Sequence, residues 1–491
     1  MLTHAKQQLN DYADYNDDLQ SASSSPHTSA TFDPANRIFE WRHQRLFGVG
    51  GTALHFEGVM LRPVEDDLRT RSKFSYSRDW PIEYKELEPW LLEAEKETGV
   101  SGNADNPYSS PRSGPFPMPA LAFSYFDNEI YAPALHKLGM VGHSFPRCVN
   151  SQPYDGRSAC LSCRICKFCP SGARYSPDRV LIPRLANVPN VTVLDNTSVR
   201  RLESIADGSR VHVAHAIRLQ DMSDAVISAD RFVLAMGGVE TPRMLLLSAD
   251  EHAQRDGLGN AGGQLGRGFS DHLFPAATVD VGRRVGSRPG YETMITDYYR
   301  SSKLKRDTPS FNILGSPAMD WFPIGNEATR WSIHGETLSL QEVRERIPRI
   351  AVLSTQSEIE GNGMLELDAE NVDEFGAPVA KITMPLSDWD LSAQSEFAMV
   401  AEKLADAMGA ANLSNEAPPG AGLGYHPSGA TAMGTSPDTG VCDKNLRVFG
   451  TDNVYVASSS VFPHMGAYNP TLTIAALTIR LAAHLRGELS A

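Results

Sequence analysis

The chain has 491 residues, of which 41% are apolar and 21% are charged, a composition typical of a globular protein with more than one domain. Its formal net charge of −14 argues against a nucleic-acid binder, because that function needs a basic surface. No apolar run reaches the roughly 18 residues that a membrane span requires, so we expect no membrane span.

Residues 1–35 are acidic, rich in serine and weakly patterned, and we expect them to be poorly ordered. They contain no hydrophobic core of the secretory type. The sequence therefore predicts a cytoplasmic protein by default, and it leaves export together with a partner open.

The run GVGGTALHFEG, residues 48–58, places three glycines within four positions, as phosphate-binding loops do. Its spacing is G-x-G-G, which differs from the dinucleotide fingerprint G-x-G-x-x-G, and no convincing strand precedes it. Residues 1–40 contain no glycine, although the fingerprint needs glycine so that backbone can approach a pyrophosphate. We expect the chain to be an N-terminally shortened protein or one half of a split one.

Five of the six cysteines lie between residues 148 and 169, which is not the distribution of a disulfide-stapled protein. Four of them, Cys160, Cys163, Cys166 and Cys169, are separated by two residues each and are followed by a proline. The run resembles the ferredoxin pattern C-x2-C-x2-C-x3-C-P but is one residue short at the last gap. An iron–sulfur cluster is therefore one hypothesis, and a zinc site is a weaker alternative.

Short β-branched runs alternate with helical ones in two parts of the chain, which predicts an α/β fold. We expect strands at 191–195, 212–219 and 230–238, and a strand with the loop after it at 453–462. Thr241 is the predicted cap of a helix that starts at Pro242, and Asn469 is the predicted cap of a helix that starts at Pro470.

Residues 276–424 have a different pattern, with short apolar runs between turn-rich and acidic linkers. We expect strands at 349–354, 363–369 and 378–384 and a helix at 392–410. This part reads as a mixed α+β region inserted into the first one.

His426 and Asn469 are the candidate catalytic pair. A neutral histidine can accept the proton of a substrate hydroxyl, because its pKa lies near the working pH. An asparagine amide can hold the same oxygen. The residues alone also fit a plain alternative, in which His426 is a loop histidine and Asn469 only caps a helix.

Several motifs together resemble the glucose–methanol–choline (GMC) flavin oxidoreductases, nearest the pyranose-oxidase and sugar-dehydrogenase large-subunit branch. They are the block from HPSGATAMG to YNPTLT, the run LAMGGVETPRMLLLS, the segment GRGFSDHLFP and the loop VGGTALHFEG. The resemblance covers most of the chain from residue 40 onward. The main departure is the glycine-free N-terminal stretch.

The resemblance implies an α/β fold with a Rossmann-like FAD-binding domain, N-terminally incomplete, and an inserted α+β substrate domain. The FAD-binding domain would be discontinuous, with segments 36–75, 141–275 and 425–491. Residues 76–140 and 276–424 would form the substrate-binding domain and insert.

The resemblance also implies site residues. His426 would be the catalytic base and Asn469 its partner, whereas His272 would be structural. Cofactor contacts would come from Gly50, Gly51, Thr52, His55, Val199, Gly237, Thr241, Ala457, Ser458, Pro470 and Thr471. His55 matches a position that carries the flavin covalently in pyranose-oxidase-like relatives, which makes covalent attachment a hypothesis.

The implied function is FAD-dependent oxidation of a CH–OH group, most plausibly on a sugar or polyol, by hydride transfer to the flavin. Sugar dehydrogenases of this type that carry an iron–sulfur cluster near the cysteine run pass electrons to a cytochrome, so a cytochrome or small subunit is a candidate partner. The alternative is a flavin-free remnant, or a subunit whose phosphate-binding unit is supplied by a partner.

Overall fold

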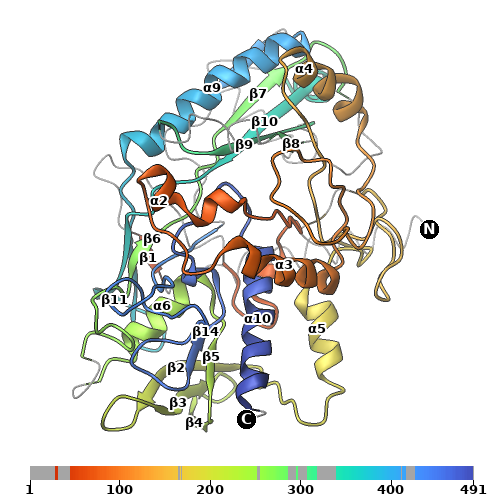
Figure 1. The fold of residues 1–491 in the computed structure, drawn as a ribbon. Helices are drawn as coiled ribbons and strands as arrows, with labels where there is room; N and C mark the ends of the chain where they lie inside the picture. The colour runs from red at the N-terminus through yellow and green to blue at the C-terminus, as the bar shows by residue number, and fades with distance from the viewer. Residues whose placement is uncertain are drawn as a thin grey trace.

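The structure is a computed structural model, and it describes residues 28–30, 45–163, 166, 169–250, 255–285, 295–296, 307–317, 339–410, 412–415 and 426–489. Its two ends differ in architecture (Figure 1): a five-stranded sheet covered by a long helix lies at one end, and a parallel strand pair with two helices at the other. Apart from 28–30, the segment 1–35, which we predicted to be poorly ordered, lies outside the described residues. The structure therefore does not test the prediction about an N-terminal fingerprint.

The parallel pair consists of β5 (Phe232–Leu234) and β14 (Val454–Val456). β5 leads into α6 (Gly237–Leu247), and β14 leads through the 3₁₀ turn η8 (Ser459–Val461) to α10 (Thr471–Leu489). The backbone N–H of Ala457 donates to the Leu234 carbonyl at 2.8 Å, so the loops after both strands start at the same sheet edge. The strands expected in 230–238 and 453–462 are confirmed.

Beside this pair lies an antiparallel sheet of β2 (Thr197–Ser204), β3 (Val211–Arg218) and β4 (Ser223–Ser228). It confirms the strand expected at 212–219. The strand expected at 191–195 is wrong: these residues are irregular and exposed. A β-branched run forms a strand only when a neighbour satisfies its backbone groups, and here the strand beside β3 begins two residues later, at Thr197.

Both predicted helix starts are displaced. α6 begins at Gly237, directly after β5, so that Thr241 and Pro242 lie inside it, although we expected them to start it. In α10 the first intrahelical bond runs from the Ile474 N–H to the Pro470 carbonyl at 2.9 Å, which makes Pro470 the cap residue. Asn469 therefore lies one residue before the cap, and its side chain is used elsewhere.

The five-stranded sheet has the order β13-β7-β10-β9-β8 and is antiparallel throughout. Its strands are β7 (Ala276–Asp280), β8 (Ile295–Thr296), β9 (Phe311–Pro317), β10 (Ile350–Ser357) and β13 (Asn412–Asn415). One face, with Phe311, Ile313 and Leu353, forms a core with α9 (Asp388–Met408) and α4 (Ala132–Lys137). This sheet and α9 confirm the strand expected at 349–354 and the helix expected at 392–410.

A four-stranded sheet, β1-β12-β11-β6, packs its apolar side chains against Val239 of α6. Its strands are β1 (Thr28–Ala30), β6 (Arg267–Phe269), β11 (Gly363–Val372) and β12 (Pro378–Thr383). The strands expected at 363–369 and 378–384 are confirmed as part of it.

α3 (Tyr84–Thr98) shares a core with the parallel pair and α10, so a helix from segment 76–140 lies beside the expected FAD-binding unit. The division into two discontinuous domains stays a prediction.

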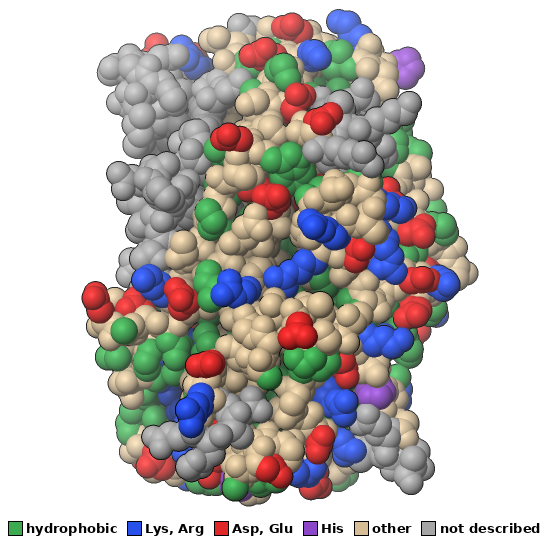
Figure 2. Space-filling view, turned by 60° about the vertical axis from the view of Figure 1, so that its left-hand side comes forward, with side chains coloured by type: hydrophobic (Ala, Val, Ile, Leu, Met, Phe, Trp, Pro, Cys, Tyr) green, Lys and Arg blue, Asp and Glu red, His purple; other side chains and the backbone are tan. Residues whose placement is uncertain are grey.

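The remaining short elements are η2 (Gly51–Leu54), η3 (Glu65–Leu68), α2 (Thr70–Phe74), η4 (Asp127–Tyr131), α5 (Pro177–Leu185), α8 (Leu340–Arg346) and η7 (Ile347–Arg349). On the face shown in Figure 2, acidic and basic side chains are interspersed. Among the described residues, no helix combines the length and the apolar character needed to cross a membrane.

Candidate active site

Two segments far apart in the sequence meet where the candidate base lies. Ser270 and Ser428 exchange backbone hydrogen bonds of 3.0 and 2.9 Å, which places the residues after β6 against those after His426. Gly429 lies so close to this strand that a Cβ on it would stand 1.9 Å from the Gly268 carbonyl oxygen, and its φ is +71°. The close approach therefore requires glycine at this position.

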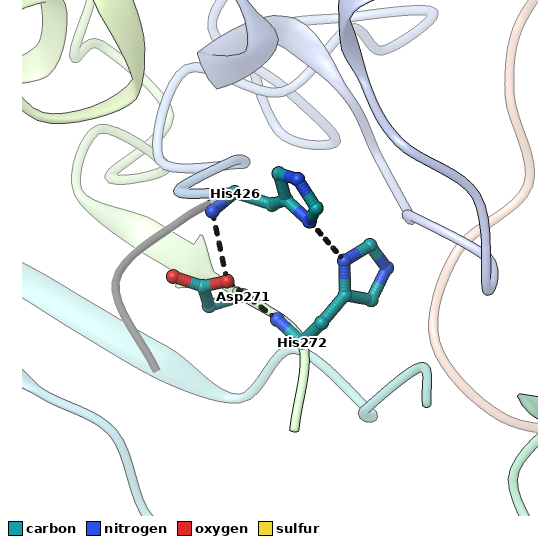
Figure 3. A group of neighbouring side chains, drawn as sticks. All are labelled: Asp271, His272 and His426. Atoms are coloured by element: carbon teal, nitrogen blue, oxygen red, sulfur yellow. Dashed lines mark hydrogen bonds between the residues drawn. The ribbon is translucent and has the colours of Figure 1, made fainter. Parts of the chain in front are cut away.

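Asp271 holds the two histidines in place (Figure 3). Its Oδ1 accepts the backbone N–H of His272 at 2.6 Å and the backbone N–H of His426 at 3.0 Å. Asp271 is fully buried. One carboxylate thus fixes the backbone of both histidines, and it also lies within 4.8 Å of a ring nitrogen of each.

The two imidazole rings are joined directly, with His272 Nδ1 and His426 Nδ1 2.8 Å apart. His272 Nε2 lies 2.8 Å from the Gly466 carbonyl oxygen, which can only accept, so His272 carries its hydrogen on Nε2. In a neutral His272, Nδ1 is then an acceptor, and His426 Nδ1 must be the donor to it. This leaves His426 with a lone pair on Nε2.

Asn469 faces that lone pair, since its Nδ2 donates to His426 Nε2 at 3.2 Å. The chain of donors and acceptors therefore runs from Asn469 through His426 and His272 to the Gly466 carbonyl. Burial, and secondly the neighbouring His272, lowers the pKa of His426 well below its ordinary value. His426 is thus held neutral, in the tautomer whose Nε2 can take a proton.

Asp271, His272 and His426 are the one group of three potential metal ligands within 4.8 Å of one another in the described part of the chain. Both nitrogens of His272 are already engaged, one with a carbonyl and one with the other ring. The carboxylate oxygen accepts two backbone N–H groups. We therefore interpret this group as a hydrogen-bonded catalytic cluster.

A second buried cluster of side chains surrounds His464, on the loop between η8 and α10. His464 Nε2 is 2.9 Å from Glu358 Oε2, and the Tyr76 hydroxyl donates to Glu358 Oε1 at 3.0 Å. Burial, followed by the charge of Glu358, raises the pKa of Tyr76 far above its ordinary value, so the phenol stays protonated. Trp80 Nε1 donates to the His464 carbonyl at 3.0 Å, so this cluster anchors the loop that leads to Asn469.

Predicted cofactor residues gather at the carboxyl edge of the parallel strands, where α/β folds bind nucleotides. Gly237 and Ala457 follow β5 and β14, and Ser458 caps the 3₁₀ turn η8. Gly238 packs so closely on the His426 loop that a Cβ would stand 2.1 Å from the Pro427 carbonyl oxygen. The structure therefore brings this edge against the candidate base.

The donor set at this edge fits FAD. Gly237 has φ +77° and nothing within 4 Å of the place of a side chain, so its backbone borders open space. The Thr241 hydroxyl is fully buried and has no hydrogen-bond partner among the described residues. α10 begins at Thr471, directly after Pro470. The free N–H groups at the start of a helix favour a negatively charged group there.

The glycine loop lies beside α6. Gly50, Gly51 and Thr52 enter η2, and His55 closes it. Arg45, just before the loop, is paired at 3.0 Å with Glu240 in the first turn of α6. Arg174 donates to the carbonyls of Ala53 and Leu54 at 3.0 and 2.9 Å. Val199, another of the predicted cofactor contacts, lies outside this loop, on β2.

The four clustered cysteines are partly or fully buried. Among the described residues, no three of their sulfurs lie within 4.8 Å of one another, whereas a tetrahedral zinc site would hold them about 4 Å apart. Backbone N–H groups donate to two of the sulfurs, from Ser162 to Cys160 at 3.3 Å and from Arg174 to Cys169 at 3.1 Å. Burial raises the pKa of Cys160.

One cavity, lined by Arg62, Arg112 and His143 among others, contains none of the predicted site residues. Both arginines hydrogen-bond Glu95, with contacts of 2.7 to 3.0 Å. The charges there are mutually satisfied, so this cavity is not a candidate for the chemistry.

Sequence reasoning missed the roles of Asp271 and Glu358, and it assigned His272 only a structural role. The GR-x-x-x-DH motif was visible, yet nothing in its spacing shows that the Asp-His pair lies against His426. That proximity depends on the pairing of Ser270 with Ser428, which joins residues more than 150 positions apart.

With this fold and site in place, the class of protein follows. The chain matches the family models for the two halves of the GMC oxidoreductases, at residues 35–274 and 360–478. The chain belongs to the GMC oxidoreductase family. It is an alcohol or sugar oxidoreductase with FAD as cofactor.

Among curated proteins, it is 27% identical to the fructose dehydrogenase large subunit of Gluconobacter japonicus, covering 97% of this chain and 88% of that one. It is 25% identical to the gluconate 2-dehydrogenase flavoprotein of Pantoea cypripedii, over 90% and 79%. Among solved structures, it is similar in fold to pyridoxine 4-oxidase from Mesorbium loti, with a TM-score of 0.62, 17% identity and coverage of 90% and 84%.

Proposed function

We propose that the protein oxidises a CH–OH group of a sugar or polyol, with His426 as the base that takes the hydroxyl proton. Bound FAD would supply the acceptor for the hydride that leaves the carbon. The observation that carries this proposal is the hydrogen-bond chain that leaves the lone pair of His426 on Nε2, the nitrogen facing Asn469.

The proton step depends on His426 being neutral before the reaction. Desolvation of its partly buried ring and its contact with His272 lower its pKa, so it is ready to accept a proton at neutral pH. The positive charge that forms on the ring lies near the Asp271 carboxylate. A negative charge at that distance stabilises the imidazolium.

Asn469 would orient the substrate oxygen. Its amide is 3.2 Å from His426 Nε2, which is the place that a substrate hydroxyl must approach. It lies immediately before the cap of α10, so the helix dipole favours negative charge developing beside it.

The residues proposed to hold FAD are the cofactor contacts that the family resemblance implies, from Gly50 to Thr471, including Val199 at the adenine end. The test is the flavin spectrum of the purified chain, with and without added FAD. The absence of a bound-flavin band near 450 nm after reconstitution would favour the alternative, a flavin-free remnant that needs a partner to supply the phosphate-binding unit. Acid precipitation tests covalent attachment at His55, since flavin released into the supernatant would contradict it.

The names of the two dehydrogenase relatives support a sugar or sugar acid as substrate. The words "large subunit" support assembly with another chain, which we propose to be a small subunit or an electron-accepting cytochrome. The cytoplasmic location, with export beside a partner as the alternative, is likewise a proposal.

We also propose that Cys160, Cys163, Cys166 and Cys169 hold an iron–sulfur cluster. N–H groups directed at sulfur, as at Cys160 and Cys169, are a feature of such sites. Protein purified without oxygen should contain about three or four irons per chain and show broad visible absorbance. Iron-free protein purified in the same way would contradict the cluster, and peroxide formation with oxygen alone would favour an oxidase.

The decisive experiment mixes the FAD-loaded chain with a panel of alcohols in the absence of oxygen. Bleaching of the flavin by a sugar or polyol, slowed when the hydrogen on the reacting carbon is replaced by deuterium, is the expected result. A flavin that binds but is reduced by no alcohol on the panel would contradict the proposal.

A further inference from the structure

We propose that Asn312 and Gln356 bind a second hydroxyl group of the substrate, next to the one that is oxidised, and so select polyhydroxylated alcohols over simple ones. The inference rests on the proposed function. It concerns two residues of the five-stranded sheet that no motif singled out.

The register of the sheet places these side chains in one row. Gln356 on β10 is directly opposite Asn312 on β9. On its other side, β10 continues its pairing with the segment before β7, where Leu273 is opposite Ser357 and Ala276 is opposite Ser354. The same register puts Phe274 opposite Gln356, and directly opposite residues project from the same face of a sheet.

This row ends at the catalytic base. The ring of Phe274 lies 5.4 Å from the ring of His426, centre to centre. The opposite face of the same strands, with Phe311, Ile313 and Leu353, packs on α9. The face that carries Asn312 and Gln356 is therefore the one directed toward His426.

Asn312 is also hydrogen-bonded to the loop that carries Gly466 and Asn469. Its Nδ2 donates to the Ala467 carbonyl at 2.9 Å. Ala467 lies between Gly466, whose carbonyl orients His272, and Asn469. One end of the Asn312 amide is thus fixed by the loop, which determines where its oxygen points.

Two polar atoms of this row have no partner among the described residues. Asn312 Oδ1 and Gln356 Nε2 are buried and make no hydrogen bond there, while the residues are only 2% and 5% exposed. Leaving a buried polar atom unsatisfied is unfavourable, because the atom has lost its hydrogen bonds to water. A hydroxyl group, which both donates and accepts, would satisfy the amide oxygen of Asn312 and the amide N–H of Gln356 at once.

The chemistry separates substrate classes. A sugar or polyol can offer one hydroxyl to His426 and another to this amide pair. A monohydric alcohol leaves the pair unsatisfied, and sites built to bind a hydroxyl reject analogues that lack it. The row therefore favours a substrate with at least two hydroxyl groups within a few carbons of each other.

The test variant is Gln356→Met, which keeps the side-chain length and removes the hydrogen-bonding group. The probes are D-fructose, D-glucose, D-gluconate and sorbitol, with cyclohexanol and 2-propanol as monohydric alcohols. In the wild-type protein we expect kcat/KM for at least one polyol to exceed that for both monohydric alcohols by more than tenfold. In Gln356→Met, kcat/KM for that polyol should fall about 10- to 100-fold while monohydric turnover is unchanged.

Thr278→Val is the matched control. Thr278 carries another buried hydroxyl without a partner among the described residues, and it projects from the same face of the sheet, two residues into β7. Thr278→Val should leave unchanged the ratio of kcat/KM for the polyol to kcat/KM for the monohydric alcohols. Equal losses for all alcohols in Gln356→Met, or a changed ratio in Thr278→Val, would overturn the inference.

Calorimetric titration of each polyol into wild-type protein and Gln356→Met gives a readout that needs no turnover. Tighter polyol binding by the wild type supports the inference, and equal or absent binding overturns it. If no alcohol is oxidised yet a polyol binds through Gln356, the proposed function fails and the binding inference stands. If alcohols are oxidised without any preference for polyols, the proposed oxidation of alcohols stands and the inference about Asn312 and Gln356 fails.

Discussion

His272 Nδ1 lies 2.8 Å from His426 Nδ1, and this contact determines which nitrogen of the candidate base carries a hydrogen. Because the far nitrogen of His272 is committed to the Gly466 carbonyl, the hydrogen between the two rings belongs to His426. The proposed mechanism gives the two histidines different functions: His426 would accept the proton, and His272 would position it to do so.

Replacing His426 by Gln should remove the base without emptying the space. We expect kcat to fall about 10²- to 10⁴-fold, which is the usual contribution of a general base, while FAD binding is retained. Stopped-flow measurement of flavin reduction checks this directly. A variant that reduces flavin at the wild-type rate would show that the base is elsewhere.

The pH profile should reflect the lowered pKa of His426. Only the neutral ring can accept a proton, so kcat/KM rises with pH through this pKa and is level above it. Since burial and His272 move the pKa well below 6.5, the acid limb should lie well below pH 6.5. An acid limb centred at or above 6.5 would contradict the assignment.

His272→Phe should leave the His426 ring in place but remove the acceptor for its Nδ1 hydrogen. We expect kcat to fall about 10- to 100-fold, because the ring then also adopts the tautomer with hydrogen on Nε2. The acid limb of the profile should stay well below pH 6.5, since burial, the larger cause of the lowered pKa, is unchanged. His272→Asn, whose amide oxygen can accept that hydrogen, should recover part of the rate. If the role of His272 were purely structural, His272→Asn would recover no more of the rate than His272→Phe.

Asn469→Ala should lower kcat/KM about tenfold, the effect of losing one hydrogen bond to the reacting oxygen. Asn469→Asp should differ in kind, because a carboxylate beside His426 Nε2 stabilises the charged ring and raises its pKa. The acid limb should therefore shift upward in the Asp variant alone. Identical profiles for the two variants would place Asn469 away from His426 in solution.

Asp373→Asn should weaken the attachment of β11 and β12 to α6. Asp373 accepts from Arg243 at 2.6 Å and from Arg200, and although burial raises its pKa, these arginines lower it by more. Removing one partner of a buried ion pair costs about 3–5 kcal/mol of unfolding free energy.

Urea denaturation at pH 7 measures that cost. Because the pKa of Asp373 is lowered by folding, its contribution is present above the unfolded value near 3.8 and is lost as the pH falls below it. The control is Glu93→Gln, which breaks an exposed pair with Lys96 and should cost about 0–1 kcal/mol. Equal effects of the two substitutions would contradict the buried role.

Much of the fold was accessible from the sequence where local pattern and tertiary demand agree. β3, β5, β14 and α9 lie where their periodicity predicts them, because their apolar faces are also the faces that the core buries. The predicted catalytic pair, His426 and Asn469, is brought into hydrogen-bond contact.

The errors arose where long-range contacts outweigh local preference. The β-branched run at 191–195 finds no partner strand and stays irregular, and α6 starts at Gly237 because the chain must turn directly after β5. The importance of Asp271 and of the row at Asn312 and Gln356 depends on strand pairings between residues more than 40 positions apart. No spacing within a single segment encodes such contacts.

The residues proposed to handle the proton and those proposed to set selectivity belong to different parts of the structure. Asp271, His272, His426 and Asn469 all lie on loops outside the five-stranded sheet, whereas Asn312 and Gln356 are strand residues within it. Directed evolution confined to β9 and β10 should therefore change which alcohol is accepted while the base chemistry stays intact. The same separation offers a route by which one inherited reaction could be adapted to many carbohydrates.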